Sequence, residues 1–112
     1  MKNREFAEKI GFTVLTGDSG QDRDIKGVYV GDLLSRVMSN ALQGFIWITI
    51  HTHMNILAVA TLNELPLIII PENVTVPEQV VVKAINENIM ILSTECSAYD
   101  TCCKCYEILE KK

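Results

Sequence analysis

The residue types best suited to chemistry follow the apolar runs of this chain, at the points where strands are expected to end. Ligands of open α/β sheets bind beyond the carboxyl ends of the strands, where helix N-termini also favour small anions. We therefore expect the polar residues in these positions to gather at one edge of a sheet and to bind a small anionic ligand. The alternative is that they are ordinary caps and turns. These residues are Asp18, Thr52, His53, Asn55, Glu72, Ser93 and Thr94.

Two histidines, His51 and His53, form a His-x-His pair directly after the apolar run 45–50. On an extended segment both imidazoles face one side and can share a metal ion. A third ligand would have to come from Glu72, Glu95 or a cysteine. A bare His-x-His also occurs by chance, so the favoured interpretation is a pair of loop histidines with hydrogen-bond partners and no metal cofactor.

All four cysteines lie in the last 17 residues, in the pattern Cys-x5-Cys-Cys-x-Cys, which matches no zinc-finger or ferredoxin spacing. On a helix the last three of them fall on two stripes, and cysteine commonly packs as a small apolar residue. We expect reduced thiols that fill the core, with a metal or redox sensor as the alternative. The cysteines are Cys96, Cys102, Cys103 and Cys105; the stripes are Ala98, Cys102, Cys105 and Leu109, and Tyr99, Cys103 and Tyr106.

No catalytic motif is present in the sequence. It contains no phosphate-binding GxxxxGK[ST] loop, no GxGxxG after a strand and no GxSxG nucleophile elbow. An acid–base pair could be assembled from Glu72, Glu95 and His53, but nothing in the spacing requires one. We expect a protein that is not an enzyme.

Composition limits the kind of protein that can position these residues. The chain has 112 residues, 48% of them hydrophobic and 21% charged, which predicts one globular domain over 1–112. The net charge is −4 with no basic cluster, so a nucleic-acid partner is not expected. The apolar runs are too short to span a membrane and no apolar signal region follows the first residues. A cytoplasmic location is expected.

The N-terminal part, 1–44, holds all six glycines and is expected to be loop-rich. We predict a helix over 2–10, strands over 12–16 and 25–30, and a helix over 33–41. Asp32 stands where an N-cap would be, since an aspartate carboxylate can accept hydrogen bonds from the first turn of a helix.

The remaining chain alternates between apolar strands and helices, with strands expected over 45–50, 67–70 and 89–92 and helices over 56–64, 77–88 and 97–111. The valines 80–82 favour a strand by propensity, but Pro77-Glu78-Gln79 is typical of a helix start, so helix is preferred. Alternation of this kind predicts a three-layer α/β/α domain with a mostly parallel sheet of about five strands. The expected core includes Ile46, Ile48, Ile50, Ile68, Ile70, Ile91 and Leu92.

Four stretches together resemble the DRTGG domain family. They are Asp-Arg-Asp-Ile-Lys-Gly over 22–27, Tyr-Val-Gly-Asp-Leu-Leu-Ser over 29–35, Trp-Ile-Thr-Ile-His-Thr-His-Met-Asn-Ile-Leu-Ala-Val-Ala over 47–60 and Ile-Ile-Ile-Pro-Glu over 68–72. Nearly the whole chain is covered. The sequence departs from the family where Lys26-Gly27-Val28 replaces Thr-Gly-Gly and where His51 replaces a frequent glutamine.

This resemblance implies an accessory or regulatory role. DRTGG domains occur beside CBS domains and in some phosphotransacetylases, they are similar to the N-terminal domain of HPr kinase/phosphorylase, and stand-alone members accompany iron-only hydrogenase systems. The resemblance implies a regulatory or ligand-sensing domain that pairs with itself. Our first hypothesis is a non-catalytic regulatory homodimer that binds a nucleotide or another small anion. The alternatives are a protein-interaction subunit of a redox or hydrogenase system, and a metal or redox sensor that uses His51, His53 and the cysteines.

Self-association is also expected from the helices. Neighbouring residues on a helix are about 100° apart, so the three valines 80–82 cannot all face one core. The stripe formed by Tyr99, Cys103 and Tyr106 adds apolar surface beside the core stripe. Apolar patches mark interfaces, and a two-fold dimer is the commonest homo-oligomer, so we expect a homodimer. The alternative is that these residues are scattered singly on the surface.

Overall fold

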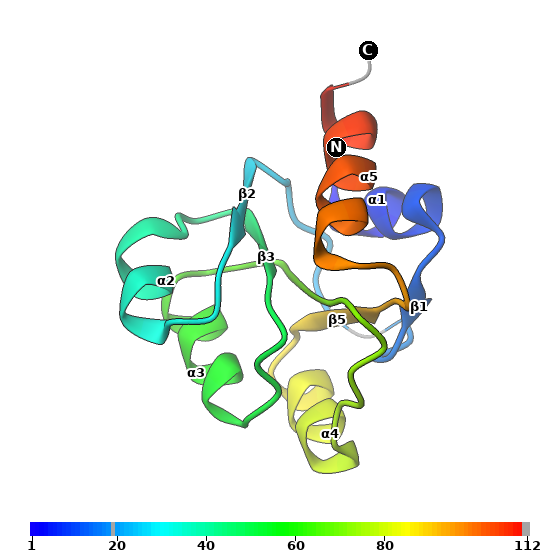
Figure 1. Ribbon diagram of the computed structural model, residues 1–112. Helices are drawn as coiled ribbons and strands as arrows, with labels where there is room; N and C mark the ends of the chain where they lie inside the picture. Colours follow the sequence, from blue (N-terminus) through cyan, green and yellow to red (C-terminus); the bar gives the residue numbers. More distant parts are fainter. Residues whose placement is uncertain (19, 111–112) are drawn as a thin grey trace.

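A five-stranded sheet lies between two helical layers in the computed structural model, which describes residues 1–18 and 20–110 (Figure 1). The strands are β1 (Thr13–Val14), β2 (Gly27–Val30), β3 (Phe45–Ile48), β4 (Leu67–Ile70) and β5 (Met90–Ser93). The helices are α1 (Asn3–Ile10), α2 (Leu34–Asn40), α3 (Asn55–Leu62), α4 (Glu78–Asn86) and α5 (Ala98–Glu110). The expected end of the last helix at Lys111 lies outside the described residues.

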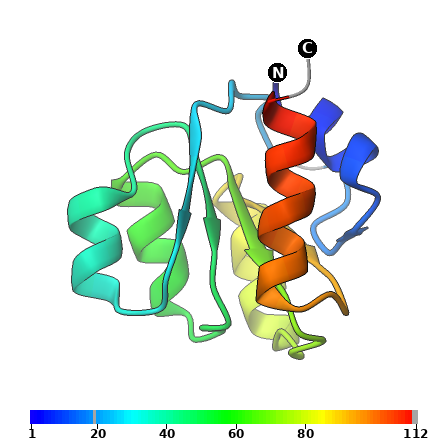
Figure 2. The same cartoon turned by 45° about the horizontal axis from the view of Figure 1, so that its top comes forward.

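The strand order is β1-β5-β4-β3-β2, and β2, β3, β4 and β5 run parallel while β1 pairs antiparallel with β5. Figure 2 shows α1 and α5 over one face of the sheet, with α2, α3 and α4 on the other. The predicted three-layer α/β/α domain with a mostly parallel sheet is confirmed. Among the described residues, no helix has the length and apolar character needed to cross a membrane.

Each face of the sheet has its own core because side chains alternate along a strand. Trp47, Ile68 and Ile91 pack on the side of α2, α3 and α4, and Trp47 is fully buried. Ile48 and Ile69 pack on the side of α1 and α5 together with Phe6. Both faces of β4 are covered, which explains why all four of its residues are buried.

The residues expected in the core are buried with one exception, Ile50. Ile50 is 46% exposed, so its predicted burial is wrong; β3 ends at Ile48, and Ile50 lies in the loop beyond the two helical layers. The predicted helix through the valines 80–82 is confirmed as α4, with Val80 buried and Val82 half-exposed, as neighbours on a helix must be. The other expected core residues are buried, namely Ile46, Ile48, Ile68, Ile70, Ile91 and Leu92.

Candidate functional site

The carboxyl ends of β2, β3, β4 and β5 meet at one edge of the sheet, called here the carboxyl edge. The strand register pairs Val30 with Ile48, Ile48 with Ile69, and Ile70 with Ser93. Each of these strands then leads into a loop and the start of a helix, so the polar residues after the strands come to this edge. Six of the seven predicted ligand residues lie here: Thr52, His53, Asn55, Glu72, Ser93 and Thr94.

Asp18 lies at the opposite edge, so its predicted place is wrong. Because β1 runs antiparallel to β5, the chain leaves β1 toward the start of β5, where Leu15 donates a backbone hydrogen bond to Ile91. Asp18 lines a hollow there with Arg4 and Met90. Its backbone carbonyl accepts a hydrogen bond from the Arg4 guanidinium at 3.4 Å.

Two small hollows open at the carboxyl edge. The first, about 220 Å³, is lined by Thr13, Asn73, Ser93, Thr94 and others around the end of β5. The second, about 110 Å³, lies between the ends of β2, β3 and β4 and the start of α5, and it brings Glu72 close to Asp32 and Thr49. Of the predicted residues, Ser93 and Thr94 line the first hollow and Glu72 lines the second, whereas Thr52, His53 and Asn55 lie at the same edge but line neither of these two hollows.

The residues at the start of α3 hold one another in place. The Nδ1 atom of His53 accepts a hydrogen bond from the backbone N–H of Asn55 at 3.1 Å. One imidazole nitrogen is therefore used to accept from a backbone N–H in the first turn of α3, which has no partner within the helix. The other ring nitrogen, Nε2 of His53, is the one that can hydrogen-bond to a ligand.

Asp32 belongs to this site, although it was predicted from the sequence to be the N-cap of the following helix. Helix α2 begins at Leu34 with Leu33 as its extended N-cap, so Asp32 comes one residue too early to cap it. Its Oδ1 atom instead accepts hydrogen bonds from the Thr49 hydroxyl at 2.6 Å and the Ile50 backbone N–H at 3.0 Å. Thr49 is buried and its Oγ1 atom accepts from the His51 N–H. This network fixes the loop between β3 and α3.

The two histidines are neighbours in this loop. Their ring centroids are 6.4 Å apart and the rings meet edge to face at 66°. The Nε2 atom of His51 is buried and has no hydrogen-bond partner among the described residues. Across 1–18 and 20–110, the structure gathers no three histidine, cysteine or acidic side chains that could hold a metal ion.

The cysteines lie on and just before α5 and are all unpaired thiols. Cys105 is buried against the core that contains Phe6 and Ile69. Burial, with a smaller contribution from the charge of Cys102, raises the pKa of the Cys105 thiol to about 12. Burial also raises the pKa of Cys102. Both thiols are protonated at neutral pH, and a protonated thiol is a poor nucleophile.

A larger cavity of about 430 Å³ lies at the amino ends of the strands and was not found from the sequence. Its charged lining comes from segments just before β2, β4 and β5. The signal that could have drawn attention to it is the stretch 22–27, which the resemblance singled out without giving it a place in the fold. The charged lining residues are Arg23, Asp24, Lys26, Glu64 and Glu87.

Comparisons with known proteins give one line of evidence on the fold. A scan against models of protein families finds no match, and a search of curated proteins finds none either. A solved structure of the CBS and DRTGG domains of the regulatory region of Clostridium perfringens pyrophosphatase, complexed with the activator diadenosine tetraphosphate, has a similar fold. The TM-score is 0.67 at 13% identity over 92% of this chain, which spans 45% of that one. The likeness supports a DRTGG-like fold.

Proposed function

We propose that this chain is a non-catalytic, cytoplasmic regulatory domain that senses a nucleotide or a related small anion at the carboxyl edge. The observation that carries the proposal is the meeting of Glu72, Ser93 and Thr94 with Asp32 around two hollows at that edge. The similar fold in a regulatory region complexed with a nucleotide activator supports the same class of function.

The lining of the hollows favours the sugar and base of a nucleotide as the inserted part. The carboxylates of Asp32 and Glu72 accept hydrogen bonds, as ribose hydroxyls and base amino groups require. The Ser93 and Thr94 hydroxyls can donate to ring nitrogens or phosphate oxygens. Each hollow is smaller than the roughly 300–1,000 Å³ of a pocket that encloses a drug-sized ligand, so each takes one part of the ligand while the phosphates stay outside.

A thermal-shift experiment with ATP, AMP and diadenosine tetraphosphate tests this proposal. A nucleotide at about ten times its Kd is expected to raise Tm by about 5 °C, because binding to the folded state alone stabilises it. Ser93→Val replaces the hydroxyl at the larger hollow with two methyl groups and is expected to weaken binding at least about tenfold, because a donor is lost and the hollow is narrowed. Ser35→Val, on the exposed surface of α2, is the matched control and is expected to bind like the parent.

Two results would contradict the proposal. One is that no nucleotide moves Tm at millimolar concentration, which would favour a protein-interaction module instead. The other is that Ser93→Val and Ser35→Val bind a nucleotide equally well, which would place the ligand away from the end of β5.

We further propose that a second copy of this chain packs beside the carboxyl edge. Val30 and Ile50 line the smaller hollow and are about half exposed. Two further exposed apolar residues are near this lining in the sequence: Leu33 comes three residues after Val30, and Tyr99 follows Ala98, which also lines the hollow. The exposed fractions reach 65% for Leu33 and 77% for Tyr99. β2 is also an edge strand, with one side unpaired in this sheet. Two large apolar side chains on one hollow, with two more exposed ones close to its lining residues in the sequence, are typical of an interface.

Sedimentation of the protein at micromolar concentration is expected to give twice the chain mass of 12.5 kDa. Leu33→Asp is expected to shift the mass toward the monomer, because a carboxylate in an apolar interface loses its hydration. Aspartate is favourable at a helix N-cap, so this variant is expected to fold. Leu42→Asp, beyond the other end of α2, should leave the mass unchanged. A monomeric parent would remove this proposal.

A further inference from the structure

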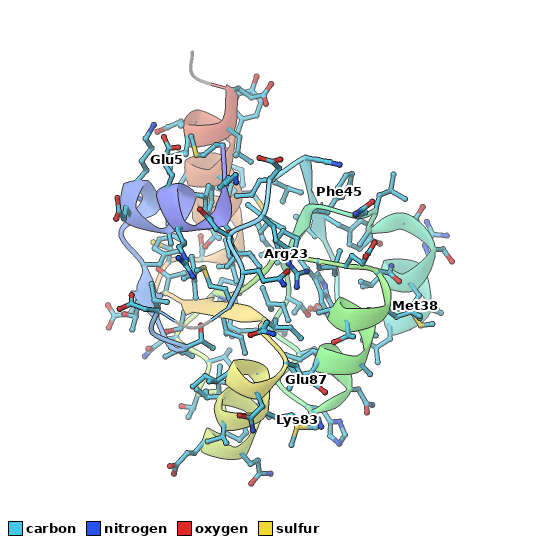
Figure 3. All side chains as sticks on the ribbon, turned by 180° about the vertical axis from the view of Figure 1, so that it is seen from behind. Glu5, Arg23, Met38, Phe45, Lys83 and Glu87 are labelled. Carbon is cyan, nitrogen blue, oxygen red and sulfur yellow. The ribbon has the colours of Figure 1, made fainter. Side chains whose placement is uncertain are left out.

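The cavity at the amino ends of the strands, called here the amino-edge cavity, holds charges of both signs. Four segments that are far apart in sequence line it: 21–26, 43–44, 60–64 and 87–89. Figure 3 shows Arg23 near the middle of the molecule seen from behind, with Glu87 below it beside α4. The buried side chains of Ala60 and Ile89 also line the cavity.

A buried asparagine fixes the wall that carries Arg23. Asn3 is 2% exposed, and its Oδ1 atom accepts from the Arg23 backbone N–H at 2.8 Å. Its Nδ2 atom donates to the carbonyls of Gln21 and Pro66, each at 3.4 Å, and its backbone N–H donates to the Arg23 carbonyl at 2.9 Å. The backbone at Arg23 is thereby tied to α1 on both sides, so the cavity wall is preformed.

A glycine positions the second cation. Gly44 has a φ of +85°, and its backbone accepts from the Lys26 N–H at 2.9 Å and donates to the Glu64 carbonyl at 3.1 Å. The Lys26 stem crosses this glycine so closely that a Cβ on it would lie 2.9 Å from Lys26 Cγ. Only glycine fits both the backbone angle and the close approach. Lys26 and Glu64 are therefore joined to one backbone position at the cavity.

The charges in the cavity do not neutralise each other in pairs. No ion pair within 4 Å joins Arg23, Lys26, Asp24 or Glu64 to any of the residues in 1–18 and 20–110; Glu87 pairs with Lys83 at 3.4 Å. Two cations and three carboxylates thus face one volume. The C-termini of α3 and α4 lie at this edge and add partial negative charge.

This distribution selects one kind of ligand. A simple anion would be repelled by the unpaired carboxylates of Asp24 and Glu64 and by two helix C-termini, and a simple cation would be repelled by Arg23 and Lys26. A molecule with a carboxylate and an ammonium group satisfies both sets at once. The planar guanidinium of Arg23 matches a carboxylate with two parallel hydrogen bonds, while carboxylates accept from an ammonium group.

We propose that the amino-edge cavity binds a small zwitterion of the α-amino-acid class. Its carboxylate lies against Arg23 and Lys26, and its ammonium group lies against Glu64 and Asp24. The volume of about 430 Å³ admits such a molecule with its side chain. This site is separate from the carboxyl edge and does not depend on the function proposed for that edge.

Isothermal titration and thermal shift on the full chain with each of the common L-amino acids at 10 mM test the proposal. At least one is expected to raise Tm by about 5 °C if its Kd is near 1 mM. For that amino acid, the analogue without its carboxylate and the analogue without its amino group are each expected to bind at least about tenfold more weakly.

Variants locate the site. Arg23→Gln keeps the backbone bonds to Asn3 and is expected to weaken binding at least about tenfold, as is Glu64→Gln. Arg36→Gln, on the exposed side of α2, is the matched control and should bind like the parent. The proposal is overturned if no amino acid binds, if either one-charge analogue binds as well as the amino acid, or if Arg23→Gln binds as well as Arg36→Gln.

Discussion

Replacing Leu67 by alanine is expected to lower the free energy of unfolding by about 2–5 kcal/mol. Leu67 is fully buried at the start of β4, where it packs in the core that contains Phe6, Ile46 and Met90. Truncation removes three buried carbon atoms and leaves a cavity, because both neighbouring strands hold the backbone in place. A loss of this size is a large fraction of the roughly 5–15 kcal/mol that stabilises a typical domain.

Leu62→Ala is the matched control for this substitution. Leu62 ends α3 only five residues earlier, yet its side chain is 67% exposed. Alanine also has the higher helix propensity, so the expected change is within about 0.5 kcal/mol. Urea denaturation of the two variants measures the difference. Equal losses in both would mean that β4 is not the central strand described above.

Asn3→Ala is expected to lower the free energy of unfolding by about 2–4 kcal/mol, although it removes only a small polar group. The Asn3 amide makes hydrogen bonds to the backbone of Gln21, Arg23 and Pro66. Alanine would leave the Arg23 N–H and two carbonyls without these partners in a largely buried place. Buried groups without partners cost more than the net value of the hydrogen bonds that are lost.

Asn40→Ala is the control, since Asn40 is exposed and its amide makes one hydrogen bond, to the Arg36 carbonyl within α2. Its expected cost is below about 1 kcal/mol. Hydrogen exchange at the Arg23 amide gives an independent readout, because only Asn3→Ala removes the acceptor of that N–H. Unchanged protection of this amide in Asn3→Ala would contradict the hydrogen bond from the Arg23 N–H to the Asn3 side chain.

The sequence by itself determined which strands are buried on both faces and the three-layer arrangement of helices around a mostly parallel sheet. The strand over 67–70 has the predicted bounds because prolines at 66 and 71 flank a purely apolar run. Once strands and helices alternate, the strands joined by crossover helices run parallel, and their carboxyl ends meet at one edge. The places of His53, Glu72 and Ser93 at that edge follow from this local pattern alone.

The tertiary structure decided the direction of β1. This strand has two residues, too few for a periodic signal, and its partner β5 lies about 75 residues further along the chain. Its antiparallel pairing with β5 carries Asp18 to the far edge. The hydrogen bonds of Asp32 could not be predicted from its sequence neighbours either. Its partners Thr49 and Ile50 are 17 and 18 residues away, and they reach it only when β2 and β3 are in register.

The amino-edge cavity shows most clearly what local sequence patterns reveal and what only the tertiary structure decides. The stretch 22–27 is visible in the sequence, but nothing local says that Arg23 and Lys26 share a volume with Glu64 and Glu87. Hydrophobic periodicity reports which side of an element is buried, since that depends on neighbours three or four residues away. The meeting of charged groups from three loops depends instead on strand order and register, and these are fixed only when the whole sheet packs between its two helical layers.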